Sequence, residues 1–158
     1  MRIGLGFDAH AFDPGRSLVL GGVTIPDAPG LAGHSDADVV SHALADALLG
    51  AAGVGDLGDM FPPNDAWRDA SSLRILAESA AVARSANWEL ASADVTVIAE
   101  RPRLAPHRRA MAERMAAAVG AAPALLSVKA TTTDGLGFTG RGDGIAAIAV
   151  VLLAPVTQ

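Results

Sequence analysis

The sequence predicts an α/β sandwich (α+β), with one mixed sheet and helices packed on one face of that sheet. Segments with strand-like alternation and segments with helix-like spacing occur in the order strand, hairpin, helix, helix, strand, helix, strand, strand. The chain has 158 residues, of which 51% are hydrophobic. This length and composition predict a single domain spanning residues 1–158.

The first predicted elements are a strand and a hairpin. Ile3, Leu5 and Phe7 alternate with small or charged residues, which predicts a half-buried strand that ends near Phe7. Apolar segments 18–20 and 23–25 flank two glycines, as in a hairpin with a glycine turn.

A helix is expected next, running to about residue 52 and ending at Gly53. Ser35 would be its N-cap and Asp38 its capping-box partner. The remaining expected elements are a loop over 53–69 that contains Pro62 and Pro63, a helix over 71–85, a strand over 90–99, a helix from Pro106 to Gly120, and strands over 128–132 and 145–153.

Composition narrows the possible partners. Aromatic residues make up only 4% of the chain, so a core of small aliphatic residues should gain further burial at subunit interfaces. The net charge of −5 and the isoelectric point of about 5.2 disfavour nucleic acid and membrane partners. Cysteine is absent, so a metal site must use His, Asp or Glu.

The compartment expected from the sequence is the cytoplasm. The chain runs from Met1 directly into a strand-like pattern, without the features of a signal peptide. The longest apolar run, residues 145–154, is far shorter than the roughly 20 residues that span a bilayer.

Three residues are candidate metal ligands. Alternation along the first strand places Asp8 and His10 on one face, and His42 on the following helix can add a third ligand. Two imidazoles and a carboxylate, with one position left open, are typical of a catalytic zinc site. The alternative is that Asp8 forms a turn and His10 is a surface histidine.

The helix that carries His42 supports the metal interpretation. Asp38 and Asp46 lie four residues before and after His42, on the same helix face. Either carboxylate could accept a hydrogen bond from the histidine nitrogen that does not meet the metal. The alternative is an exposed acidic face.

Two segments are suited to binding oxyanions. His34 and Ser35 precede the helix, where free backbone N–H groups favour a phosphate, although Ser35 could equally be only an N-cap. Residues 129–143 combine three threonines, many glycines and Arg141. By contrast, segments 56–58 and 61–65 taken alone indicate only a surface loop.

Taken together, the motifs resemble the 2-C-methyl-D-erythritol 2,4-cyclodiphosphate synthase family of non-mevalonate isoprenoid biosynthesis. The matching segments are Gly6-Phe-Asp-Ala-His10, His34-Ser-Asp-Ala-Asp38, residues 42–50, Gly55-Asp-Leu-Gly58, Phe61-Pro62, Lys129-Ala-Thr-Thr-Thr133 and Gly137-Phe-Thr-Gly-Arg-Gly142. They cover nearly the whole chain, in order and with natural spacing.

The resemblance implies a homotrimer with active sites between neighbouring subunits. It places Zn²⁺, or another divalent cation, on Asp8, His10 and His42. It places a second ion, Mg²⁺ or Mn²⁺, at Asp134 with the substrate diphosphate. It also implies that an isoprenoid diphosphate binds in a channel on the trimer axis.

The resemblance also implies which residues of this chain occupy the family's catalytic and substrate-binding positions. Positions assigned to transition-state stabilisation fall on His34 and Thr132. Those assigned to the substrate fall on Asp8, His10, His34, Ser35, Asp56, Gly58, Phe61, Asp65, Ala99, Arg103, Ala105, Thr131, Thr132, Thr133, Asp134, Phe138 and Arg141.

The implied reaction is an intramolecular phosphoryl transfer that converts 4-diphosphocytidyl-2-C-methyl-D-erythritol 2-phosphate to the cyclic diphosphate and CMP. A Zn-dependent phosphohydrolase and a non-enzymatic nucleotide-binding protein are the alternatives.

Three positions depart from the family pattern. Asp134 stands where the family usually has Glu, and its shorter side chain should weaken or shift the second ion. Arg103 stands where Lys is frequent, which keeps the charge on a planar group. Asp143 replaces a Glu that would line the channel with Phe7 and Arg141.

Overall fold

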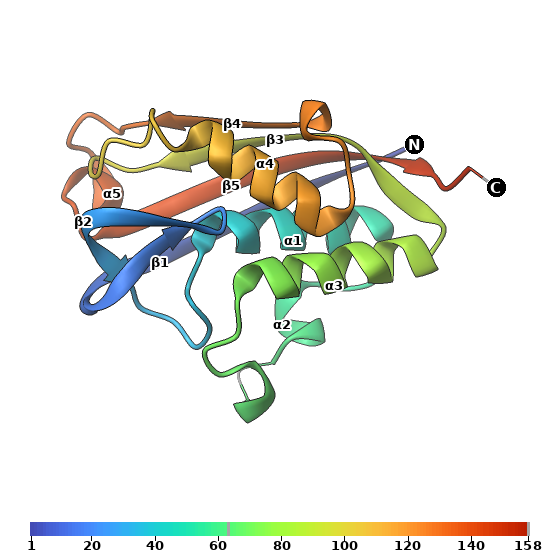
Figure 1. The fold of residues 1–158 in the computed structure, drawn as a ribbon, viewed down its shortest axis with the longest axis horizontal. Coiled ribbons are helices and arrows are strands. Elements are labelled where there is room, and N and C mark those ends of the chain that lie inside the picture. Colours follow the sequence, from blue (N-terminus) through green and yellow to red (C-terminus); the bar gives the residue numbers. More distant parts are fainter. Residues whose placement is uncertain (63, 158) are drawn as a thin grey trace.

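The computed structural model describes residues 1–62 and 64–157. Five strands form one sheet in the order β2-β1-β5-β3-β4. Their bounds are β1 Arg2–Leu20, β2 Val23–Leu31, β3 Trp88–Ile98, β4 Leu126–Thr131 and β5 Gly144–Pro155. Neighbouring strands are antiparallel except for β3 and β4, which are parallel. The prediction of one mixed sheet is therefore confirmed (Figure 1).

Three long helices lie on one side of this sheet, as predicted (Figure 1). They are α1 Val39–Ala52, α3 Ser72–Ser85 and α4 Arg108–Val119. α1 packs against β1 and β5, and α3 lies between α1 and α4. The shorter helical elements are α2 Leu57–Met60, a 3₁₀ turn at Asp65–Trp67, a second at Pro123–Leu125, and α5 Gly137–Gly140.

The loop expected over residues 53–69 contains two short helical elements. The side chain of Asp56 accepts a hydrogen bond from the amide of Asp59 and caps α2. Asn64 caps the 3₁₀ turn in the same way, by accepting from the amide of Ala66. Pro63, expected to break this loop, lies outside the described residues.

The first strand does not end near Phe7, so that prediction is wrong. β1 continues through Asp8 and His10 to Leu20 and includes the segment expected as the first arm of a separate hairpin. Its first half pairs with β5 and its second half with β2. Pairing with two neighbours outweighs the low strand propensity of aspartate and the glycines.

The apolar side chains at the start of β1 face away from the helices. Ile3, Leu5 and Phe7 are 75%, 68% and 56% exposed in the single chain. The strand is half-buried as predicted, but its buried face is the one that carries Gly4 and Gly6, and the apolar side chains lie on the exposed face.

Gly4 and Gly6 let the backbone of α1 lie directly against the backbone of β1. A Cβ added at Gly6 would lie 2.0 Å from the carbonyl oxygen of Ala43, and one at Gly4 would lie 2.2 Å from that of Ala47. Both separations are far below van der Waals contact, so no larger residue fits without moving the helix. His42 directly precedes Ala43, and this contact therefore also sets the height of His42 above the strand.

The cap of α1 is Asp38, whereas Ser35 was predicted. The fully buried Asp38 carboxylate accepts hydrogen bonds from the amides of Val40 and Ser41 and from the Ser41 hydroxyl. It also accepts from the amides of Gly21 and Gly22, at 2.8 and 2.7 Å, in the turn between β1 and β2. One carboxylate thus joins the hairpin turn to the start of the helix that carries His42.

Within residues 1–62 and 64–157, no helix is long and apolar enough to cross a membrane.

The close contact between β1 and α1 leads to a stability prediction. Gly6→Ala should lower the free energy of unfolding by about 3 kcal/mol, because the added methyl group collides with a backbone carbonyl. Gly50→Ala, at an exposed position of α1, is the control. A Cβ there would meet nothing within 4 Å, so the change should be neutral or stabilise the helix by up to about 1 kcal/mol. Urea unfolding of both variants measures the difference, and equal effects would contradict the account.

Candidate functional site

Asp8, His10 and His42 converge on one point between β1 and α1. Asp8 Oδ2 lies 2.9 Å from His10 Nε2 and 3.0 Å from His42 Nδ1, and the two ring nitrogens are 3.3 Å apart. Ligand atoms around a tetrahedral Zn²⁺ ion, with bonds of about 2.0–2.1 Å, lie about 3.3 Å from one another. The donor set and its spacing therefore fit a divalent cation.

The ring nitrogens that face away from this cluster also have partners. His10 Nδ1 lies 2.6 Å from the carbonyl oxygen of Ala32, which requires this nitrogen to donate. His42 Nε2 lies 2.9 Å from the hydroxyl of Ser72 and 3.1 Å from that of Ser35. The proposal that Asp38 or Asp46 orients His42 is wrong, because Asp38 caps α1 and Asp46 accepts from the amide of Leu57.

The cluster changes the acid–base properties of its members. Burial by itself would raise the pKa of the Asp8 carboxyl, but hydrogen bonds to His10 and His42 hold that pKa well below its usual range. Burial alone would lower the pKa of His10, but the hydrogen bond and charge of Asp8 outweigh burial and raise it. The carboxylate is thus available to a cation, whereas His10 holds its proton more tightly than an isolated histidine.

A cavity of about 240 Å³ opens beside the cluster. Its walls combine the three candidate ligands with one polar loop and a group of apolar side chains. The lining residues are Asp8, His10, His34, Ser35, His42, Leu57, Phe61, Trp67 and Ile75. The rings of Phe61 and Trp67 pack edge to face, 4.8 Å between centroids. Phe61 therefore belongs to this cavity, although the sequence alone indicated a surface loop.

The helix start expected to bind an anion beside His34 and Ser35 is already occupied. The amides of Val40 and Ser41 donate to Asp38, so they are not free for a phosphate. Ser35 is 6% exposed, and its hydroxyl contacts His42. His34 stays half-buried at the cavity wall, with Nε2 2.7 Å from the carbonyl oxygen of Asn64.

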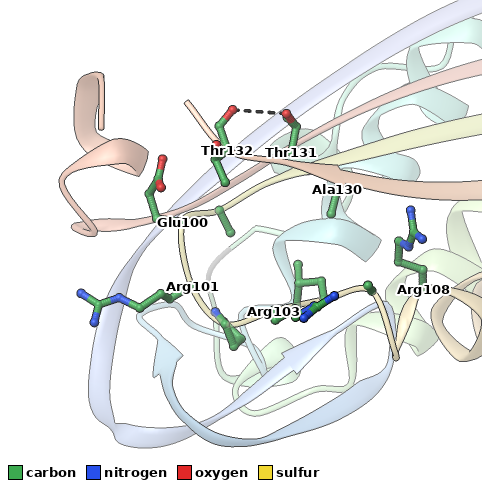
Figure 2. A pocket seen from close by; sticks show the side chains of 11 residues that line it. Glu100, Arg101, Arg103, Arg108, Ala130, Thr131 and Thr132 are labelled. Atoms are coloured by element: carbon green, nitrogen blue, oxygen red, sulfur yellow. Dashed lines mark hydrogen bonds between the residues drawn. The ribbon is translucent and has the colours of Figure 1, made fainter. Parts of the chain in front are cut away.

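A second cavity, of about 400 Å³, lies where β3 and β4 end (Figure 2). Its walls come from the loop after β3 and from the last residues of β4. The lining residues are Ala99, Glu100, Arg101, Pro102, Arg103, Leu104, Ala105, Arg108, Ala130, Thr131 and Thr132. Figure 2 shows Arg103 and Arg108 on one side and Thr131 and Thr132 on the other. The predicted residues Ala99, Arg103, Ala105, Thr131 and Thr132 are thus brought together.

Glu100 also lines this cavity, and no role was predicted for its carboxylate. Its Oε1 accepts hydrogen bonds from the amide of Thr133 at 3.1 Å and from that of Gly135 at 3.3 Å. The carboxylate therefore holds the loop after β4 against the loop after β3. A charged residue directly after a predicted strand was the available signal.

Thr133 and Asp134, in the loop after β4, were also predicted to belong to the site, but neither lines this cavity. The Thr133 hydroxyl donates to the carbonyl oxygen of Leu136 at 2.6 Å. Asp134 has a backbone φ of 52° and accepts a hydrogen bond from the Thr132 hydroxyl at 3.0 Å.

Several other predicted site residues are not brought to either cavity within the single chain. Asp56 and Gly58 are exposed on α2, and Asp65 forms an exposed ion pair with Arg68. Phe138 is 41% exposed on α5. Arg141 pairs with Asp143 at 3.0 Å.

The two cavities are separated along the sheet. The register places Ala9 opposite Ala146, Ala146 opposite Ile98, and Ile98 opposite Thr131. Three steps of about 4.8 Å put Ala9, in the middle of β1 between Asp8 and His10, about 14 Å from Thr131 at the end of β4. The cavities share no lining residue.

Comparison with known proteins gives consistent matches. The model of the YgbB family matches residues 1–154. The 2-C-methyl-D-erythritol 2,4-cyclodiphosphate synthase of Moorella thermoacetica is 62% identical over 154 residues, covering 97% of this chain and 94% of that protein. The enzyme of the same name from Symbiobacterium thermophilum is 53% identical over 155 residues, covering 98% of this chain and 99% of that protein.

Solved structures show the same fold. The bifunctional IspDF from Campylobacter jejuni superposes with a TM-score of 0.94 at 40% identity, over 98% of this chain and 42% of that one. The CDP complex of Plasmodium falciparum IspF superposes with a TM-score of 0.85 at 31% identity, over 99% of this chain and 97% of that one.

The proton held by His10 leads to a prediction about pH. Because its pKa is raised above the ordinary 6.5, the proton competes with a metal ion at Nε2 as the pH falls through that raised value. Zn²⁺ affinity should therefore be constant at alkaline pH and fall by about tenfold per pH unit once His10 is protonated. Competition with a chelator at a series of pH values measures this.

The control for that series is His107→Asn, since His107 precedes α4 and lies outside the cluster. This variant should reproduce the wild-type profile. Zn²⁺ affinity that is independent of pH, or that rises as the pH falls, would contradict the assignment of His10.

Proposed function

Because this chain belongs to the YgbB family, we propose that its metal cluster and its second cavity together carry out the cyclisation that its relatives' names describe. The activity is 2-C-methyl-D-erythritol 2,4-cyclodiphosphate synthesis, a step of isoprenoid biosynthesis. The convergence of Asp8, His10 and His42 is the observation that carries the proposal.

The reaction is a phosphoryl transfer within one molecule. The 2-phosphate of 4-diphosphocytidyl-2-C-methyl-D-erythritol 2-phosphate attacks the β-phosphorus of the diphosphate. A new P–O bond closes the ring, the bond from the β-phosphorus to the bridging oxygen breaks, and CMP leaves with that oxygen. No water is consumed. The nucleophile is already an anion, so the protein needs no general base and acts by positioning and charge neutralisation.

Asp8, His10 and His42 would hold one divalent cation, and we propose Zn²⁺. A bound cation would supply Lewis-acid stabilisation of charge on the phosphate oxygens. We propose that His34, at the wall of the same cavity, contributes to transition-state stabilisation through Nδ1, because its Nε2 donates to the carbonyl oxygen of Asn64. We propose Mg²⁺ or Mn²⁺ as a second ion at Asp134, whose exposed carboxylate accepts a hydrogen bond from Thr132 in the wall of the other cavity.

The nucleotide would occupy the second cavity. Its walls contain the positive charges of Arg103 and Arg108 and the hydroxyls of Thr131 and Thr132. Both kinds of group donate hydrogen bonds to phosphate oxygens, so the cavity is suited to a diphosphate. Its volume of about 400 Å³ is within the usual range for small-ligand sites. We assign Thr132 to transition-state stabilisation, because its hydroxyl links this cavity to Asp134.

We also propose that a complete site forms between two subunits of a homotrimer. Ala9, between two of the candidate ligands, lies about 14 Å across the sheet from Thr131 in one chain, so a neighbouring subunit would have to bring the two halves together. The exposed Ile3, Leu5 and Phe7 offer an apolar surface for such an interface. Phe7, Arg141 and Asp143 would then line the axial channel, with an isoprenoid diphosphate as its ligand.

We propose that residues 1–158 form one domain, since β1 and β5, from opposite ends of the chain, pair along ten residues of each strand.

Product analysis tests the proposed reaction. The purified protein with the diphosphocytidyl substrate should release CMP and the cyclic diphosphate in equal amounts. His42→Ala should remain folded and lose roughly 100-fold or more of the CMP release rate, because a ligand to the activating ion is removed. His107→Asn should retain the wild-type rate.

Other outcomes of that experiment would refute the proposal. Linear phosphate without a cyclic product would indicate hydrolysis. A folded His42→Ala variant with the wild-type rate would refute the metal assignment.

Glu100 provides a separate test of the nucleotide cavity. Glu100→Ala removes the acceptor of two backbone amides and should raise the dissociation constant for CDP about tenfold. Glu100→Gln keeps an acceptor oxygen and should stay close to wild type. Glu113→Ala, which removes only an exposed pair with Arg109, is the control. Isothermal titration with CDP measures all three, and equal affinities for Glu100→Ala and wild type would contradict this role.

A further inference from the structure

The imidazole of His42 contacts a second polar cluster, on the side that faces away from Asp8. Its Nε2 lies 2.9 Å from Ser72 Oγ and 3.1 Å from Ser35 Oγ. Ser72 is fully buried, and Ser35 and His42 are 6% and 7% exposed. The orientation of this ring is therefore set by hydrogen bonds that water does not replace.

Asp36 lies behind Ser72 and accepts two hydrogen bonds from it. Asp36 Oδ2 accepts from the Ser72 amide at 3.0 Å, and Oδ1 accepts from the Ser72 hydroxyl. The amide of Asp38 also donates to Oδ1, at 3.2 Å. Each of these groups is a donor to Asp36, which is the pattern expected of an ionised carboxylate.

The direction of these hydrogen bonds determines which nitrogen of His42 carries a proton. A serine hydroxyl has one proton, and that of Ser72 points to Asp36. Its oxygen is therefore left to accept, so His42 Nε2 must donate to it. With the proton on Nε2, a neutral ring has its lone pair on Nδ1, which is the nitrogen 3.0 Å from Asp8 Oδ2.

We infer that Asp36, acting through Ser72, is a positioning residue that holds His42 in the tautomer and orientation required of a metal ligand. The inference rests on the proposed metal site. The tautomer of His10 is set by the hydrogen bond from its Nδ1 to the backbone carbonyl of Ala32. A side-chain substitution cannot remove that carbonyl. The control of His42 depends on side chains and can be tested by mutation.

Two variants interrupt the chain of hydrogen bonds at different points. Ser72→Ala removes the hydroxyl between the carboxylate and the imidazole. Asp36→Asn can present an amide donor to the Ser72 hydroxyl, which would turn that hydroxyl toward His42 as a donor and favour the opposite tautomer. Ser79→Ala is the matched control, because Ser79 is a fully buried serine on the same helix whose hydroxyl donates to the Ile75 carbonyl.

The first measurement is the Zn²⁺ affinity of the full-length protein, by competition with a chelator. Ser72→Ala and Asp36→Asn should each bind Zn²⁺ about 10 to 100 times more weakly than wild type. Ser79→Ala should bind Zn²⁺ as wild type does. Circular dichroism and thermal unfolding check that each variant is folded. If Ser72→Ala does not fold, Asp36→Asn decides the outcome.

The second measurement is the tautomer of His42 before Zn²⁺ is added, from two-bond ¹⁵N–¹H correlations on ¹⁵N-histidine-labelled protein. The wild type should show the proton on Nε2, and Asp36→Asn should shift the population toward Nδ1. A general loss of stability would not produce this change.

Three results would overturn the inference: a folded Ser72→Ala variant with wild-type Zn²⁺ affinity, the same result for Asp36→Asn, or a wild-type His42 with its proton on Nδ1. A wild-type protein that binds no Zn²⁺ would instead refute the proposed metal site. In that case the tautomer measurement would still decide whether Asp36 and Ser72 control His42.

Discussion

The backbone of α1 rests directly on the backbone of β1, and the candidate site depends on this contact. Gly6 leaves room for the carbonyl oxygen of Ala43, and the next residue on that face of the strand is Asp8. His42 directly precedes Ala43, so the fit between strand and helix also fixes the distance from His42 to Asp8, 3.0 Å between Nδ1 and Oδ2. One face of β1 thus packs against α1 at Gly4 and Gly6 and carries the candidate metal ligands at Asp8 and His10. A longer side chain at either glycine would separate the ligands as well as loosen the core.

Two aspartates, Asp36 and Asp38, stabilise this arrangement through hydrogen bonds, and neither forms an ion pair within the described residues 1–62 and 64–157. Asp38 accepts five hydrogen bonds and fastens the turn between β1 and β2 to the start of α1. Asp36 receives both the amide and the hydroxyl of Ser72, and so connects the start of α3 to the imidazole of His42. Backbone amides and hydroxyls supply the donors to both carboxylates, and Asp8 is the carboxylate in direct contact with His10 and His42. The loop from Ser35 to Asp38 therefore determines both where the helix begins and how its histidine is oriented.

Patterns with a fixed period were predictable from the sequence, and contacts between distant segments were not. The two-residue repeat of a strand correctly placed Asp8 and His10 on one side, and the helix bounds near residues 71–85 and 106–120 agree closely with α3 and α4. The same repeat could not reveal which side of β1 faces the core, because the helix packs on glycines and leaves Ile3, Leu5 and Phe7 exposed. The partners of His42 were missed because Ser72 is thirty residues away along the chain. The role of Glu100 was missed because a carboxylate that binds two loop amides has no periodic signature.

The proposed function depends on the binding of one divalent cation by Asp8, His10 and His42. Anomalous diffraction at the zinc absorption edge, from crystals grown with Zn²⁺ and CDP, tests it most directly. We expect one strong peak within about 2.0–2.2 Å of Asp8 Oδ2, His10 Nε2 and His42 Nδ1, with at least one coordination position left for a phosphate oxygen or water. A map with no peak there, or with its main peak on other residues, would contradict the account.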